Sequence, residues 1–195
     1  MKIRLAISNE VKQIAKIHCQ EIKYGFLTQL GEKLLSKLYQ SIILSPSSFI
    51  VVAEDNNQVI GFISGSTNIN KFYKEFIKKY FLKTFFILLP KIFKPSAIKK
   101  IIETLCYPQK EKYLTSSELL TIAVKKESQN KDIAKLMLER FILEMEKRQI
   151  KQFKVIVGEN LLNAINFYEK AGFIFHSFIS VHKNKSSKIY IYKLK

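Results

Sequence analysis

The chain has 195 residues, of which 47 % are hydrophobic and 25 % charged, proportions typical of one globular domain. They exclude disorder, collagen and coiled coil as descriptions of the whole chain. Lysine and arginine number 33 against 16 acidic residues, which gives a formal net charge of +17. Such a surface attracts anions: phosphorylated cofactors, nucleic acid or acidic lipid headgroups.

Nearly all of the positive charge is lysine, because the only arginines are Arg4, Arg140 and Arg148. The guanidinium group of arginine recognises bases and binds phosphates through pairs of hydrogen bonds, whereas the ammonium group of lysine acts as a solvated point charge. We therefore expect no sequence-specific nucleic-acid partner.

Cysteine and histidine usage favours a reducing, cytoplasmic location without a metal. Cys19 and Cys106 are too few for a disulfide framework. The N-terminus shows no signal-peptide pattern, and the most apolar stretch, 84–90, is uncharged for only seven residues, too few for a membrane span. The histidines lack metal-ligand spacing, and we expect structural or surface roles for them: His18, His176 and His182.

Hydrophobic periodicity predicts alternating strands and helices. In chain order we expect a strand over 2–7, a helix capped by Ser8 or Asn9, a helix over 31–44, strands over 49–53 and 59–64, a strand over 118–124, a helix over 131–148, a strand over 153–157, a helix over 161–170, and strands over 173–181 and 188–194.

Local signals support these boundaries. Pro46 ends the second helix, the acidic and Asn-rich link at 54–57 indicates a hairpin, and Gly172 is a left-handed helix stop. The pattern predicts a single mixed α/β domain with a helical crossover between the strands near 120 and 155.

An insert at about 70–113 interrupts this pattern. Residues 71–112 contain eleven lysines, three glutamates and nine aromatic residues. Three interpretations stay open: a helical cap with a small core of its own, a substrate lid, and a membrane-surface patch.

Residues 118–134 read as a strand, a polar turn and a helix start. Helix N-termini leave backbone N–H groups unpaired and bind phosphates. Lys131 adds positive charge there, or is simply a solvated lysine of the first turn.

The same segment resembles the acetyl-CoA signature of the GCN5-related N-acetyltransferase (GNAT) superfamily, a valine-ended strand followed by Gln/Arg-x-x-Gly-x-Gly/Ala. Val124 ends the strand here, and Gln129 and Ala134 occupy the first and last motif positions. Asp132 stands where the middle glycine is usual. Its carboxylate either turns away and caps the helix, or weakens CoA binding.

A second segment, 163–173, is similar to the family's Asn-x-x-Ala-x-x-Phe-Tyr-x-x-x-Gly-Phe region, with the alanine directly after the asparagine. The resemblance covers residues 1–68 loosely and 114–195 well, and does not include the insert. It implies an α/β fold with a central mixed sheet of about six to seven strands and helices on both faces. The fourth and fifth strands of that fold splay apart.

The resemblance also implies acetyl-CoA as co-substrate, lying between the splayed strands. Backbone groups of Ile122 and Val124 would bind the pantetheine arm, and an amide near Ala123 would polarise the thioester carbonyl. The remaining contacts implied are amides for the pyrophosphate at Gln129, Asn130, Lys131, Asp132, Ile133 and Ala134, and pantetheine contacts at Asn163, Asn166 and Phe167.

By the same resemblance, Tyr168 is the candidate general acid and Glu118 the candidate base, acting through water. Without the family, the tyrosine reads as an amphipathic residue at the edge of a core. The glutamate reads as a structurally paired or solvated strand end.

The leading hypothesis is an acetyl-CoA-dependent N-acetyltransferase for a primary amine on a small molecule, such as an amino sugar. Transfer to a protein or peptide N-terminus or to a lysine is the second hypothesis. The third is a degenerate fold that binds anionic surfaces. Peripheral membrane contact through the insert and an oligomeric state also stay open.

Overall fold

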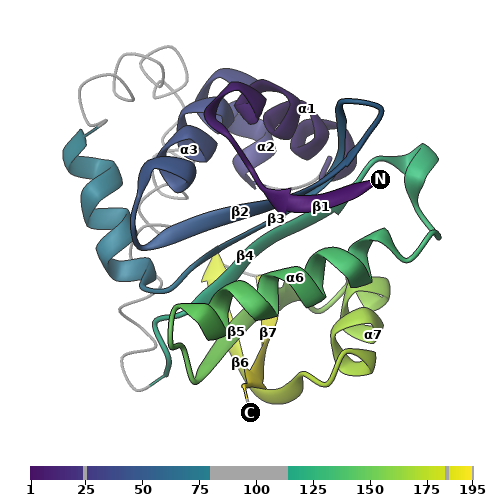
Figure 1. The fold of residues 1–195 in the computed structure, drawn as a ribbon. Helices are drawn as coiled ribbons and strands as arrows, with labels where there is room; N and C mark the ends of the chain where they lie inside the picture. The colour runs from purple at the N-terminus through teal and green to yellow at the C-terminus, as the bar shows by residue number, and fades with distance from the viewer. Residues whose placement is uncertain (24–25, 80–113, 183–184, 195) are drawn as a thin grey trace.

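The computed structural model describes residues 1–23, 26–79, 114–182 and 185–194. Its centre is a seven-stranded sheet of order β1-β2-β3-β4-β5-β7-β6. Neighbouring strands are antiparallel except β4 and β5, which are parallel. Helices cover both faces of the sheet (Figure 1). The predicted mixed α/β fold is therefore confirmed.

The strands are β1 (Lys2–Leu5), β2 (Ser48–Asp55), β3 (Gln58–Ser66), β4 (Glu118–Val124), β5 (Gln152–Gly158), β6 (Ile174–His182) and β7 (Lys185–Lys193). The helices are α1 (Val11–Glu21), α2 (Phe26–Leu30), α3 (Glu32–Leu44), a helix over 69–79, α6 (Ile133–Lys147) and α7 (Leu162–Lys170). Short 3-10 turns precede α1 and α6: η1 (Ser8–Glu10) and η2 (Lys126–Ser128).

One face of the sheet carries α1, α2 and α3 (Figure 1). Apolar residues spaced three and four apart give α1 and α3 one buried stripe each. These stripes and helix 69–79 pack on the alternate residues of β2 and β3 that point to this side. The resulting core includes Ile14, Ile17, Leu35, Tyr39, Ile42, Ile50, Val52, Phe62 and Phe72.

The opposite face carries α6 and α7 (Figure 1). Phe141 of α6 lies at the centre of this core, with its ring 5.0 Å from that of Phe49 and 5.3 Å from that of Phe153 between centroids. Met137, Met145, Val155, Ile165, Tyr168 and Phe173 complete it. The sheet thus separates two cores, and β4 contributes residues to both.

Both predicted hairpins form. The β2–β3 turn places Asn56 and Asn57 at φ values of 46° and 60°, the left-handed geometry that a two-residue hairpin loop requires. The closing hairpin pairs β6 with β7. Before it, Gly172 ends α7 at φ 91°, as the left-handed stop predicts.

Two elements differ from expectation. The short helix α2 has no counterpart among the predicted elements. Helix α6 begins at Ile133 rather than at residue 131, because two residues before it adopt left-handed backbone conformations. Helix 69–79 opens the predicted insert, while Cys106 and the rest of the insert at 80–113 lie outside the described residues.

Candidate active site

The strands β4 and β5 pair only at their beginnings. Their register contains Glu118 opposite Lys154 and Leu119 opposite Val155, and no later pair. Beyond these residues β4 continues along β3 to Val124, while β5 continues along β7. The two central strands therefore splay apart as predicted, which opens a gap toward their carboxyl ends.

Backbone groups of β4 line this gap. The N–H of Lys125 donates to the carbonyl of Ile60 at 2.8 Å, so this pair is hydrogen-bonded in the antiparallel ladder. Hydrogen-bonded and non-hydrogen-bonded pairs alternate. Ile122 and Val124 therefore direct their N–H and C=O groups away from β3 and toward the gap, whereas Ala123 directs its own toward β3.

A bulge in β4 lies beside the first of these gap-facing residues. Leu119 is opposite Gly65 and Thr121 is opposite Ser64, which leaves Leu120 as the extra residue. A bulge bends the strand and changes the direction of its backbone groups. The alternating pattern of the sequence gives no sign of it, and the site therefore includes a backbone feature that sequence reasoning missed.

The loop from β4 to α6 contains two residues with left-handed backbone conformations. Asn130 and Asp132 have φ values of 60° and 55°, a left-handed region where asparagine and aspartate are the best tolerated residues after glycine. Asp132 stands at the N-cap of α6, and its side chain makes no capping hydrogen bond. The helix-capping alternative for Asp132 is therefore wrong.

The first turn of α6 supplies free amides. The first turn of an α-helix has no internal acceptors for its N–H groups, and the first bond within α6 runs from the N–H of Leu136 to the carbonyl of Asp132 at 3.0 Å. Ile133 is buried and Ala134 half-buried. The remaining predicted loop residues are exposed: Gln129, Asn130, Lys131 and Asp132.

Gln129 ties this loop to the end of β4. Its Nε2 donates to the carbonyl of Val124 at 2.9 Å and to Glu21 Oε2 at 3.4 Å. The N–H of Lys126 donates to the other Glu21 oxygen at 3.2 Å. The Gln129 side chain therefore has a structural partner, and Glu21 of α1 is a loop contact that lies 108 residues away in sequence.

Tyr168 of α7 lies in the core that α6 and α7 form with the sheet. It is 4 % exposed, and its ring packs 5.4 Å from Phe167 and 5.2 Å from Phe173 between centroids. Burial raises the pKa of its phenol well above the usual value, so the hydroxyl keeps its proton at neutral pH. On the same helix Phe167 is half-buried, and Asn163 and Asn166 are exposed.

Glu118 stands at the closed end of the gap. It is 4 % exposed, and Lys154, its register partner on β5, is 1 % exposed. Register partners extend from the same face of a sheet, so a carboxylate and an ammonium group leave this face side by side. Lys154 carries no motif signal and was not among the predicted site residues.

The three histidines have different surroundings. His18 is buried, with Nδ1 2.5 Å from the hydroxyl oxygen of Tyr39. His176 is exposed, and the side chain of His182 lies outside the described residues. Within the described ranges, no three His, Cys, Asp or Glu side chains gather as a metal site would need. Over the same ranges, no helix is long and apolar enough to cross a bilayer.

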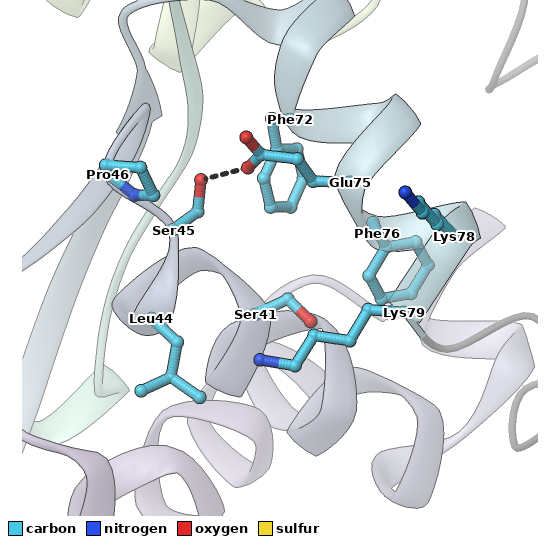
Figure 2. A pocket seen from close by; sticks show the side chains of 9 residues that line it. All are labelled: Ser41, Leu44, Ser45, Pro46, Phe72, Glu75, Phe76, Lys78 and Lys79. Atoms are coloured by element: carbon cyan, nitrogen blue, oxygen red, sulfur yellow. Dashed lines mark hydrogen bonds between the residues drawn. The ribbon is translucent and has the colours of Figure 1, made fainter.

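A separate cavity of about 490 Å³ lies between the end of α3 and helix 69–79. Figure 2 shows Phe72 and Phe76 on one side, and Ser45, whose hydroxyl donates to Glu75 at 2.8 Å. None of the predicted CoA contacts lines it.

Comparison with known proteins agrees with this geometry. Residues 96–175 match the sequence model of the acetyltransferase (GNAT) domain. No curated protein sequence gives a significant match.

Solved acetyltransferase structures share the fold over the full chain. Ribosomal-protein-alanine N-acetyltransferase from Brucella melitensis is 14 % identical, with a TM-score of 0.65 and coverage of 100 % of both chains. The PaiA N-acetyltransferase from Thermoplasma acidophilum, solved with coenzyme A, is 17 % identical, with a TM-score of 0.62 and the same coverage. An N-acetyltransferase from Staphylococcus aureus Mu50 is 15 % identical, with a TM-score of 0.64 and coverage of 100 % of this chain and 98 % of the other.

Proposed function

We propose that this chain, whose residues 96–175 match the acetyltransferase (GNAT) domain model, transfers the acetyl group of acetyl-CoA to the primary amine of a small molecule, such as an amino sugar. The observation that carries the proposal is the gap between β4 and β5, which leads to a left-handed loop and the open N-terminus of α6. A strand edge whose backbone groups face the gap suits the amides of a pantetheine arm. A helix N-terminus suits a pyrophosphate.

In this proposal the backbone of Ile122 and Val124 binds the pantetheine arm, and the amides of residues 129–134 bind the pyrophosphate. The N–H groups that face the gap from β4 stabilise the oxygen of the thioester carbonyl as negative charge develops on it. This role is supported by the direction of these N–H groups. Their direction follows from the hydrogen-bond pattern between β3 and β4, in which Lys125 pairs with Ile60.

Acetyl transfer forms a C–N bond and breaks a C–S bond. The neutral amine attacks the carbonyl carbon, and the amine proton passes through water to Glu118. The departing thiolate of CoA takes the hydroxyl proton of Tyr168. A protonated phenol is required for this role, and the phenol of Tyr168 is protonated at neutral pH because burial raises its pKa further above the usual value.

The acceptor class rests on the charge of the chain. The net charge of +17 suits an acceptor that carries phosphate, such as a nucleotide-linked amino sugar.

Two similar structures carry names that favour the other acceptor class: ribosomal-protein-alanine N-acetyltransferase from Brucella melitensis and the ribosomal-protein-S18-alanine enzyme from Escherichia coli. At 14 % and 13 % identity they share the fold with this chain. Peptide N-termini therefore belong in the acceptor test.

Two measurements test the proposal. Isothermal titration with acetyl-CoA should give a dissociation constant in the micromolar range, about −8 kcal/mol. A panel of phosphorylated and free amino sugars, lysine and N-terminal peptides, each assayed by release of CoA thiol, should show turnover with an amino sugar. Turnover with peptides alone would assign the second acceptor class. Absence of both heat and thermal shift at millimolar acetyl-CoA would favour a binding module.

A further inference from the structure

A row of buried polar side chains crosses four neighbouring strands on one face of the sheet. The successive register partners are Ser48 with Ser66, Ser66 with Glu118, and Glu118 with Lys154. None of these four residues is more than 4 % exposed. Register partners extend from the same face of a sheet, so β2, β3, β4 and β5 each place one polar side chain in this row.

The two serines of the row have partners within the fold. The hydroxyl of Ser48 donates to the carbonyl of Ile42 at 2.9 Å, which ties β2 to α3. The hydroxyl of Ser66 donates to the carbonyl of Ser47 at 2.8 Å, which ties β3 to the start of β2. Buried polar groups with such partners are what a stable fold requires. The β2 and β3 half of the row is therefore structural.

Lys154 has a different environment. Its neighbours Phe153 and Val155 belong to the core under α6 and α7, so the lysine side chain points to the opposite face, and it is 1 % exposed. Among the described residues, the structure gives its ammonium group no hydrogen bond and no ion pair. A buried charge without a partner destabilises a fold. Folding stability therefore does not explain why a lysine occupies this position.

Lys154 also stands where β4 and β5 separate. Its pair with Glu118 and the next pair, Leu119 with Val155, are the register pairs of these two strands. Neighbouring strands lie about 4.8 Å apart, so the lysine and the proposed base extend from adjacent positions at the closed end of the gap. An ammonium group and a carboxylate side by side are complementary to a molecule that carries both an anion and an amine.

We propose that Lys154 is a specificity-determining residue, which binds a carboxylate or phosphate that the acceptor carries a few atoms from its amine. This inference rests on the proposed function, because it needs the amine to lie at Glu118. Both anions accept charge-assisted hydrogen bonds from an ammonium group. An acceptor without the anion leaves the buried ammonium group unpaired, and sites of this kind reject such analogues strongly. The net charge of the chain attracts anionic acceptors from a distance, whereas Lys154 selects them at the site.

The test compares acceptors that differ only in the anion: glucosamine 1-phosphate with glucosamine, and alanine with alaninamide. The same comparison is made for the acceptor that the panel identifies, with and without its anionic group. Lys154→Met removes the charge and keeps a long side chain. We expect kcat/KM for the anionic acceptor to fall about tenfold to a hundredfold, mainly through KM, and that for its uncharged counterpart to change less than about threefold. The pair that responds distinguishes phosphate from carboxylate as the recognised anion.

Lys151→Met is the matched control, because Lys151 is an exposed lysine directly before β5. It should change kcat/KM for neither member of a pair. Lys154→Arg keeps the charge and should keep the preference for the anion. Thermal unfolding gives a readout besides activity: Lys154→Met breaks no ion pair of the described residues, so its melting temperature should not fall. Lys154→Gln gives a second reading of the kinetics if Lys154→Met does not fold.

The outcomes separate the two proposals. An undiminished preference for the anionic acceptor in Lys154→Met would overturn the role of Lys154. An equal loss of kcat/KM for the anionic and uncharged acceptors, with a lower melting temperature, would assign the lysine to the fold instead. Turnover of uncharged amines alone by the unmodified protein would also overturn the inference. If the unmodified protein binds no acetyl-CoA or acetylates no amine, it is the proposed function that fails.

Discussion

Tyr168 is a core residue and a candidate acid at the same time. Its ring packs between Phe167 and Phe173, as any amphipathic residue at the edge of a core would. The two roles differ only in whether the hydroxyl donates a proton to the reaction. A substitution that keeps the ring and removes the oxygen therefore distinguishes them.

For Tyr168→Phe we expect kcat and kcat/KM to fall together by about tenfold or more, with unchanged affinity for acetyl-CoA. The reason is that a proton donated to the leaving thiolate matters mainly in the transition state. Steady-state kinetics with the acceptor found in the panel, together with calorimetry, gives both values. Tyr190→Phe is the control, since it deletes another buried hydroxyl, one that donates to Glu169 at 2.7 Å. An unchanged kcat in Tyr168→Phe, with chemistry rate-limiting, would leave only the packing role.

Asp132 occupies a left-handed backbone position at the N-cap of α6. Its φ of 55° is accessible to aspartate at a modest strain. The sequence predicts a departure from the motif at this residue but not how the backbone accommodates it. The missing capping bond leaves the carboxylate as a negative charge beside the proposed pyrophosphate site.

Asp132→Gly should tighten acetyl-CoA binding several-fold, because it removes a charge that repels phosphate near a helix N-terminus. Asp132→Asn separates the causes, since asparagine removes the charge and still tolerates the left-handed conformation. Titration calorimetry of both variants at low salt measures the effect. If both variants bind acetyl-CoA more tightly by the same factor, the charge of Asp132 causes the effect. If only the glycine variant binds more tightly, the size of the side chain causes it. Weaker binding in both variants would show that the pyrophosphate does not bind here.

Apart from α2, the order of the described strands and helices was predictable because each carries its own periodicity and its own stop signal. Gly172 and the Asn56–Asn57 turn act within a few residues, so local chemistry determines them. The bulge at Leu120 and the bond between Gln129 and Glu21 depend on residues far apart in sequence. The partnership of His18 with Tyr39 likewise joins two helices, and nothing in either helical pattern predicts it.

The bulge itself is packed against α6 through Gly65. A Cβ at this position would lie 2.4 Å from two ring atoms of Phe141 and 2.9 Å from the carbonyl oxygen of Glu118. Phe141 is fully buried and cannot move without disturbing its neighbours. The β3 strand therefore needs glycine where α6 crosses it.

Gly65→Ala should lower the free energy of unfolding by about 1–3 kcal/mol, the usual effect of overpacking a core, as measured by urea denaturation. Gly158→Ala is the control, because the nearest atom to its Cβ is the side-chain Oδ1 of Asn160 at 3.0 Å, which can rotate away. Adding Phe141→Leu to Gly65→Ala should recover part of the loss by making room. Full stability of Gly65→Ala alone would contradict the close packing.

Arginine and lysine differ in their surroundings over the whole molecule. Arg4 forms ion pairs with Glu10 and Glu54, and Arg140 and Arg148 both pair with Glu144, at 2.7 Å and 4.0 Å. All three arginines thus form ion pairs within the fold. The remaining basic residues are lysines, which leaves the surface with a diffuse positive field of the kind that steers anions without orienting them.

This field should make acetyl-CoA binding sensitive to salt. We expect the dissociation constant to rise by roughly an order of magnitude between 50 and 500 mM NaCl, because the Debye length falls and screens exposed charges. S-acetylpantetheine lacks the phosphates, so its KM should not change over the same range.

Local and overall charge can then be separated by two equal substitutions. Lys131→Gln removes an exposed lysine from the loop before α6, and Lys74→Gln removes one from helix 69–79, at the other end of the sheet in Figure 1. If a local field binds the pyrophosphate, Lys131→Gln weakens binding at low salt more than Lys74→Gln does, and the difference disappears at 500 mM. Equal effects would assign the salt dependence to the net charge alone. A dissociation constant that does not change with salt in the unmodified protein would mean that neither the field nor the loop lysine contributes to holding the phosphates.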